Sequence, residues 1–312
     1  MPGTAMMTSM SEWHSVRTML TRLAKGATLP VATVLLFILA LWYAGAVKLN
    51  APLVQDQYER AGRGSWAWSE LVSDTMTMER PILPAPHQVL LELDRSVLQT
   101  AITSRRSLVY HAWVTLESAL FGFALGTLLG IGLAIMIVHV ASLQRALMPW
   151  IIASQTVPIL AIAPMIVVVL GSLGLVGLLP KAIISAYLCF FPVTISMVKG
   201  LTSPEPIQLD LMRTYSASTT QTLRYLRLPA SLPFLFAGLK VAISLAVVGA
   251  IVGELPTGAQ AGLGARLLAG SYYGQTVQIW SALIMASILA GGCVGLIGGI
   301  QRGLNRRFGG AA

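Results

Sequence analysis

Residues 112–139 read AWVTLESALFGFALGTLLGIGLAIMIVH, an apolar run that holds a single acid, Glu117. About 20 consecutive apolar residues are enough for a helix to cross the hydrocarbon core of a bilayer. Several other stretches of the chain have a similar length and character. The sequence therefore predicts six membrane helices, at about 29–47, 112–139, 147–171, 178–198, 234–255 and 278–301.

The composition places the whole chain in the membrane class. Hydrophobic residues make up 55% of the 312 residues and charged residues 11%, against roughly 25% charged in soluble domains. Nine of the twelve acids lie at or before Glu117, so the rest of the chain is nearly acid-free. Ionised groups are costly in hydrocarbon, and we expect an all-α integral membrane protein.

The net charge of +9 is attributed to the basic residues that set the orientation of membrane spans, because these residues flank the apolar stretches. They form no run with interleaved aromatics, so a nucleic-acid partner is not expected. The two cysteines, Cys189 and Cys293, lie inside apolar segments and are interpreted as small core residues. Neither they nor the scattered histidines have the spacing of a metal site.

Basic residues also predict the orientation of the spans. The arm 1–28 and the loop 199–233 are basic and are expected in the cytoplasm, together with the tail 303–312. The stretch 29–47 is long for a signal peptide and is interpreted as a retained anchor. The outer loop 48–111 is expected to carry an amphipathic helix over 87–103. Residues 112–302 then form the core transmembrane domain.

Glycines spaced four apart mark two expected packing faces, since small residues let helices approach closely in lipid. They are Gly122, Gly126 and Gly130 in the second stretch, and Gly291, Gly295 and Gly299 in the sixth.

The cytoplasmic loop 199–233 is the most informative part of the sequence. A helix-forming stretch, 207–226, lies between Ser203-Pro204-Glu205-Pro206 and Leu228-Pro229-Ala230-Ser231-Leu232-Pro233. We expect one short rigid helix here, ended by the two prolines. A short rigid helix on the cytoplasmic side, where ATP is present, is what an element that transmits mechanical force to the spans requires.

This loop resembles that of permease subunits of binding-protein-dependent ABC importers. Their motif is Glu-Ala-Ala, three residues, Gly, nine residues, Ile, one residue, Leu-Pro. Asp210-Leu211-Met212 stands at the triplet, Ser216 at the glycine, and Leu226 and Leu228-Pro229 at the end. The resemblance covers about 80–310, in the branch of taurine, alkanesulfonate, nitrate and pyrimidine-precursor permeases, and the stretch 51–80 is longer than usual there. Further matches are Leu83-Pro84-Ala85-Pro86, Thr156-Val157-Pro158 to Ala163-Pro164, and Gly253-Glu254 with Gly262-Leu263-Gly264.

The resemblance implies a MetI-like, type I importer fold of six helices in the bacterial inner membrane, with both termini cytoplasmic. It implies a second permease copy, two ATPase subunits that bind ATP and Mg, and a periplasmic substrate-binding protein, with no cofactor in this chain. The loop would then be a coupling helix, whereas the alternative is an ordinary amphipathic helix on the membrane surface. The ATPase-coupling residues implied are Asp210, Arg213, Thr214, Tyr215, Ser216, Ala217, Gln221, Leu228 and Pro229.

A translocation pathway needs polar groups inside an apolar bundle. Gln155, Thr156 and Pro158 in the third span are candidates, because Pro158 frees backbone carbonyls. Glu254 is another, although an interfacial cap or a salt bridge with Arg266 are alternatives at that position.

No catalytic motif is present: the chain lacks GxxxxGK[ST], HExxH and GxSxG. ATP hydrolysis is therefore expected in a separate subunit. An ion-coupled secondary transporter is the main alternative function, but the buried ion-coupling groups and inverted repeat of that class are not evident. A membrane-embedded enzyme is the second alternative function.

The sequence leaves the substrate open among pyrimidine precursors, sulfonates, nitrate and other small polar or anionic solutes. The stretch that begins at Gly253 looks nearest to that of permeases linked to pyrimidine precursors.

Overall fold

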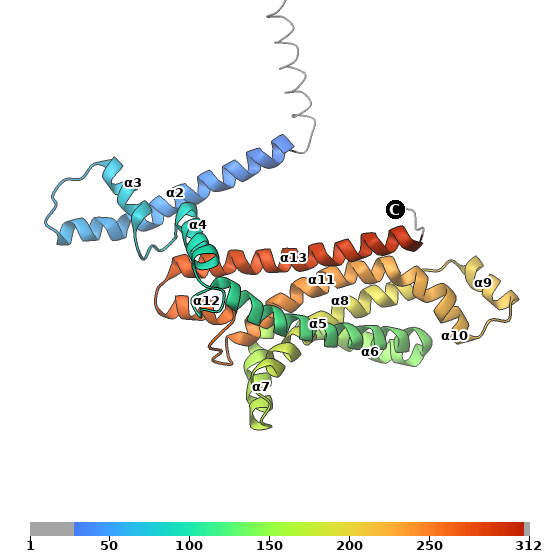
Figure 1. Cartoon of the computed structure of the whole chain (residues 1–312). Coiled ribbons are helices and arrows are strands. Elements are labelled where there is room, and N and C mark those ends of the chain that lie inside the picture. The colour runs from blue at the N-terminus through green and yellow to red at the C-terminus, as the bar shows by residue number, and fades with distance from the viewer. Residues whose placement is uncertain (1–27, 309–312) are drawn as a thin grey trace, which may run out of the picture. The chain divides into compact units, whose positions relative to one another are not determined.

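The computed structural model describes residues 28–308, and every regular element in that range is helical (Figure 1). The chain divides after Leu91 into two compact units, of which the first contains α2, α3 and most of α4. The elements are α2 (Thr28–Arg60), α3 (Trp68–Thr77), α4 (Pro86–Asp94), the π-helical turn η1 (Arg95–Gln99), α5 (Leu108–His139), α6 (Ala141–Ser154), α7 (Ile159–Ser172), α8 (Leu178–Leu201), α9 (Pro206–Thr214), α10 (Thr219–Thr222), the π-helical turn η2 (Leu223–Arg227), α11 (Leu228–Glu254), α12 (Leu263–Tyr272) and α13 (Thr276–Phe308).

Five helices are long and apolar enough to cross a membrane: α2, α5, α8, α11 and α13. A sixth span is present if the bent pair α6 and α7 is taken as one. The five helices cover the predicted stretches 29–47, 112–139, 178–198, 234–255 and 278–301 to within one residue, which confirms those predictions.

The predicted third span, 147–171, is not one helix. It breaks between Ser154 and Ile159, where α6 and α7 meet at 100°. Pro158 has an extended backbone with φ −63° and ψ 119°, and proline disfavours the helical conformation of the residue before it. The gap between the predicted second and third spans, 140–146, is likewise reduced to a corner at Val140, because α6 already begins at Ala141.

The segment 48–111, predicted to be an outer loop, is more ordered than the sequence indicates. The first helix continues 13 residues past the predicted end of its span and is followed by the short helix α3. The helix predicted over 87–103 already ends at Gln99. The spacing of its apolar residues predicts that Val89, Leu90 and Leu98 lie on one side, but Val89 is buried whereas Leu90 and Leu98 are 64% and 77% exposed.

The core of the second unit forms where α8 packs between α5 and α11. An added Cβ on Gly126 would lie 2.7 Å from the Cβ of Cys189 and 2.8 Å from the carbonyl oxygen of Ala186. An added Cβ would lie 2.4 Å from α8 at Gly122 and 2.8 Å from it at Gly130, so the expected packing face of α5 is confirmed. Cys189 and Cys293 are buried, as expected of core residues.

The second expected glycine face has a different environment. An added Cβ on Gly291, Gly295 or Gly299 of α13 would meet no described atom within 4 Å. The close packing predicted for this face is therefore not formed among the helices of the second unit.

Candidate functional site

The loop between α8 and α11 folds into what we name the coupling elbow, residues 206–227. Its first helix, α9, begins at Pro206, and the Gln208 side chain accepts a hydrogen bond from the Glu205 N–H at 3.0 Å. Proline is favoured at a helix start, where its missing N–H has no intrahelical role. The helix ends at Thr214, so the prediction of one helix over 207–226 is wrong.

The break lies at Ser216, which has a φ of +52°. This left-handed conformation costs an ordinary residue about 1–2 kcal/mol, a cost that glycine avoids. Ser216 occupies the glycine position of the resembled motif, and the backbone therefore keeps a bend there without the glycine. Ser218 caps the next helix: its Oγ accepts a hydrogen bond from the Gln221 N–H at 3.3 Å, and its own N–H donates to Gln221 Oε1 at 2.7 Å.

The two prolines after the elbow do not end a helix, contrary to expectation. Pro229 lies in the first turn of α11 and Pro233 lies inside it. Before them, the Leu228 N–H donates to the Leu223 carbonyl, the wider spacing of a π-helical turn. A π-helical turn of this kind is often found at functional sites, and here it leads from the elbow directly into the span.

The predicted coupling residues lie together on this elbow and at its junction with α11. Arg213 and Asp210 form an ion pair at 2.9 Å, with side chains 81% and 64% exposed. Ala217 and Leu228 are half-buried. The remaining predicted residues are exposed: Thr214, Tyr215, Ser216, Gln221 and Pro229.

The sequence interpretation missed two residues of the elbow. Ile207 and Leu211 are 72% and 56% exposed, and they precede Tyr215, itself 76% exposed, at intervals of four. Residues four apart share one face of a helix. We name these three residues the apolar stripe of α9, and their spacing, visible in the sequence, was the signal that could have identified them.

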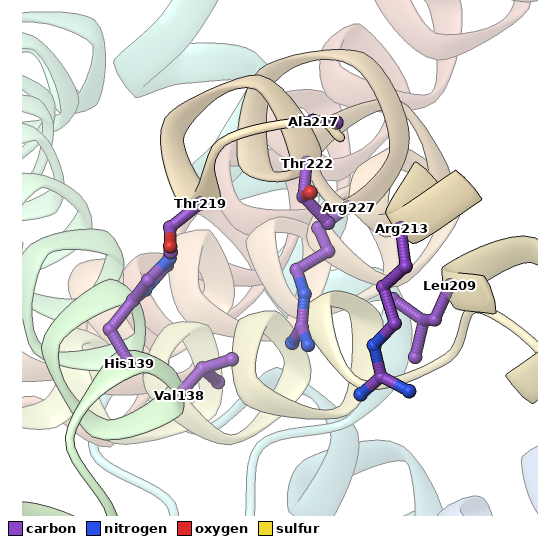
Figure 2. Close-up of a pocket in the computed structure, with 8 residues that line it drawn as sticks. All are labelled: Val138, His139, Leu209, Arg213, Ala217, Thr219, Thr222 and Arg227. Atoms are coloured by element: carbon purple, nitrogen blue, oxygen red, sulfur yellow. The ribbon is translucent and has the colours of Figure 1, made fainter. Parts of the chain in front are cut away.

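The inner side of the elbow lines a cavity of about 330 Å³. Figure 2 shows Arg213 and Arg227 of the elbow and His139 at the end of α5 around this cavity. Arg227 also donates to the Leu201 carbonyl at 3.1 Å. The elbow is thus attached to the end of α8 and has a basic inner lining.

Glu254, at the end of α11, is fully buried in a polar cluster. Its Oε1 accepts a hydrogen bond from Thr115 Oγ1 of α5 at 2.8 Å, and its Oε2 accepts one from the Gly264 N–H of α12 at 2.6 Å. A carboxylate is stabilised at a helix N-terminus, where free N–H groups and the helix dipole meet it. Glu254 therefore caps α12.

The cluster extends to the start of α5. The Leu263 N–H donates to Thr115 Oγ1 at 2.8 Å, and the Gly262 N–H donates to His111 Nδ1 at 3.0 Å. An added Cβ on Gly262 would lie 2.2 Å from the Glu254 carboxyl carbon. The Gly253-Glu254 and Gly262-Leu263-Gly264 matches of the sequence thus meet in one place.

The predicted pathway residues do not all share one environment. Gln155, Thr156 and Pro158 are exposed at the α6–α7 bend, whereas Glu254 has no exposed surface. Within the described range, Glu254 and Arg266 form no ion pair, and burial lowers the pKa of the Arg266 guanidinium. The bend is tied to α8 by a hydrogen bond from the Tyr187 hydroxyl to the Ser154 carbonyl.

No three His, Cys, Asp or Glu side chains between residues 28 and 308 lie close enough together to hold a metal ion. The described residues instead form an exposed elbow at one end of the spans and a buried polar cluster at the end of α11.

The family described as binding-protein-dependent transport system inner membrane component matches residues 126–310, more than half of the chain. The chain is 34% identical over 193 residues to the formylaminopyrimidine transport permease protein ThiX of Halalkalibacterium halodurans, which covers 62% of this chain and 72% of that one. It is 33% identical over 179 residues to the riboflavin transport system permease protein RibX of Chloroflexus aurantiacus, covering 57% and 65%.

Among solved structures, the inward-facing MetNI methionine ABC transporter has a chain that aligns with a TM-score of 0.52 and 21% identity. The alignment covers 63% of this chain and 95% of that one, and it shows the fold alone. The family match and the relatives identify the chain as an inner-membrane permease of the binding-protein-dependent transport systems, a subunit of an ABC importer, and the structural alignment shows that its fold is MetI-like.

Proposed function

We propose that this permease imports a small nitrogen-heterocyclic solute, and that the coupling elbow transmits the force of a separate ATPase to the spans. The observation that carries the coupling role is the apolar stripe of α9, which stays exposed on a rigid, capped helix. Exposed apolar side chains in a rim of polar ones mark protein contact sites. Around the stripe, Asp210 and Thr214 provide such a rim.

In this proposal α9 inserts its stripe into a cleft of the ATPase, with Tyr215 as the aromatic anchor. Ser216, Ala217 and Gln221 form the second contact beyond the bend. Leu228 and Pro229 then transmit the movement into α11, because η2 and α11 follow without a break in the helical backbone. ATP and Mg are bound by the ATPase, and this chain needs no cofactor of its own.

Two permease copies and two ATPase subunits make up the proposed complex. ATP binding closes the ATPases and turns the pore outward, and hydrolysis resets it. Such a cycle is directional because nucleotide binding favours one of two conformations. The open glycine face of α13 (Gly291, Gly295 and Gly299) supports a helix partner from a second copy. Both termini lie in the cytoplasm.

Gln155, Thr156 and Pro158 are proposed to line the pathway, because they are exposed where the bend leaves backbone groups outside regular helix. For Glu254, lining the pathway stays a prediction. Its complete burial under α12 supports a positioning role, in which it holds the outer end of α11.

The substrate class is supported by two relatives with identities above 30%, whose names refer to a formylaminopyrimidine and to riboflavin. Both compounds contain nitrogen heterocycles. Calorimetry with the substrate-binding protein encoded beside this permease tests the class: an aminopyrimidine or a flavin is expected to bind, and binding of taurine or an alkanesulfonate instead would refute it.

Coupling is tested by purifying the ATPase with the permease after the double substitution Leu211→Ala and Tyr215→Ala. We expect at least about a tenfold loss of bound ATPase, since an anchor residue contributes about 2 kcal/mol or more. Tyr273→Ala is the matched control, because Tyr273 is 69% exposed at the end of α12. Full ATPase binding by the double variant would refute the coupling role, and uptake without any ATPase would favour a secondary transporter.

A further inference from the structure

The first unit contains a helical hairpin that lies outside the residues matched by the family. The end of α2 packs against α3 through Val54, Tyr58 and Leu71, all of them buried. Asn50 fixes the base: its side-chain N–H donates to the Leu83 carbonyl at 2.9 Å, and its oxygen accepts from the Ile82 N–H at 2.8 Å. The hairpin is therefore a defined structure.

The end of the hairpin gathers aromatic and basic side chains, which we name the aromatic tip: Tyr58, Arg63, Trp66 and Trp68. Trp66 lies 6.5 Å from Trp68 and 6.4 Å from Tyr58 between ring centroids. The Arg63 guanidinium lies 5.5 Å from the Tyr58 ring centroid. Trp68 is 70% exposed and Trp66 39% exposed, so most of the Trp68 indole and part of the Trp66 indole are free to meet a partner.

Helix geometry places this tip beyond the lipid headgroups. The exposed apolar part of α2 ends near Lys48, and α2 continues to Arg60. Thirteen residues at about 1.5 Å each add roughly 20 Å. Headgroups extend only about 5–8 Å beyond the hydrocarbon on each side. Even with a tilt of about 40°, the tip lies too far out for tryptophans that anchor a protein at the membrane interface.

Tryptophan and arginine are among the residues most enriched at the energetic centres of protein interfaces. Exposing two indoles to water has no folding benefit, whereas burying them against a partner gains apolar contact area. The partner must be in the aqueous space that α2 enters on leaving the membrane, which is the outer side in the proposed orientation. The substrate-binding protein of the transport system is a soluble partner located there.

We propose that the aromatic tip is a docking surface for the external substrate-binding protein. This proposal rests on the proposed function, because it needs an importer with a binding protein outside.

The test uses the full permease–ATPase complex in nanodiscs and the purified binding protein encoded beside it. ATPase activity is measured against binding-protein concentration for the native complex and for Trp66→Ala with Trp68→Ala. We expect the double variant to need about tenfold more binding protein for half-maximal stimulation. Trp113→Ala is the matched control, since Trp113 is 66% exposed but lies on the span α5.

The results separate the two proposals. If the native complex is not stimulated at all, the proposed function fails. If it is stimulated and the double variant responds at the same concentration, the docking proposal alone is overturned.

A second measurement does not depend on activity. Benzoylphenylalanine is placed at position 68 in cells that express the permease, the ATPase and the binding protein, and is activated by light. A cross-link to the binding protein is expected. A cross-link only to a second permease copy or to lipid, or none at all, would overturn the proposal.

Discussion

Thr115 Oγ1 donates a hydrogen bond to Glu254 Oε1 over 2.8 Å, and the same hydroxyl accepts one from the Leu263 N–H. One threonine therefore connects three segments, α5, the end of α11 and the start of α12. Because Thr115 and Glu254 are both fully buried, neither has water as an alternative partner. The polar cluster is expected to move as one body when the spans change conformation.

Glu254→Gln is expected to destabilise the permease. The amide replaces one carboxylate oxygen by an N–H₂ group, which faces a donor, either Thr115 or the Gly264 N–H. An unsatisfied buried polar group costs about 1–3 kcal/mol. Thermal unfolding in detergent should show a lower melting temperature. Glu117→Gln makes the same chemical change at an exposed site of α5 and should leave the melting temperature nearly unchanged; equal losses in the two variants would contradict the capping role.

Gly264→Ala is expected to displace α12. The added Cβ would lie 2.4 Å from the Ile251 carbonyl oxygen and 2.9 Å from the Glu254 Cβ. Overpacking of this kind costs about 1–3 kcal/mol, and uptake should fall together with stability. Gly132→Ala is the control, because its Cβ would meet nothing within 4 Å and alanine favours the helix. A Gly264→Ala variant as stable as Gly132→Ala would show that the junction of α11 and α12 accommodates a methyl group without overpacking.

Hydrophobic length was sufficient to predict five of the spans, because a run of about 20 apolar residues has few alternatives to a membrane helix. The glycine spacing of α5 likewise predicted a packing face, and Gly126 lies against α8. These features depend on local sequence alone. The element that packs against a glycine face cannot be predicted from local sequence in this way. Nothing in the sequence around Gly295 distinguishes an open face of α13 from a packed one.

The candidate site was harder to predict for the same reason. Glu254 and Thr115 are 139 residues apart, and a single sequence does not show that they meet. The break at Ser216 depends on a backbone angle that serine rarely adopts. The prolines suggested that the helix ends at Pro229, but the π-helical turn before it lets the backbone continue.

Ser216→Gly should be tolerated and is expected to stabilise the elbow slightly. Glycine removes the cost of the left-handed conformation, about 1–2 kcal/mol, against an entropy cost of about 0.5–1 kcal/mol. Ser216→Val should be destabilising, since a branched side chain is poorly accommodated at positive φ. ATPase retention after purification is expected to decrease in the order glycine, serine, valine.

The neighbouring residue supplies the control for this series. Ala217 has no positive φ, so Ala217→Gly gains nothing in the folded state and loses backbone entropy. If Ser216→Gly weakened ATPase retention as much as Ala217→Gly does, the left-handed backbone conformation at position 216 would not determine how well the elbow retains the ATPase.

Tyr187→Phe is expected to loosen the bend between α6 and α7. The phenol donates to the Ser154 carbonyl, which lies in the last turn of α6, and a hydrogen bond of this kind contributes about 1 kcal/mol. Spin labels at Arg145 of α6 and Val168 of α7, both exposed, report the distance across the bend. Electron-spin distance measurements should give a broader distribution for the variant. Tyr272→Phe removes a hydroxyl from a side chain that is 79% exposed and should leave the distribution unchanged; equal broadening in both variants would show that the bend is held by Pro158 alone.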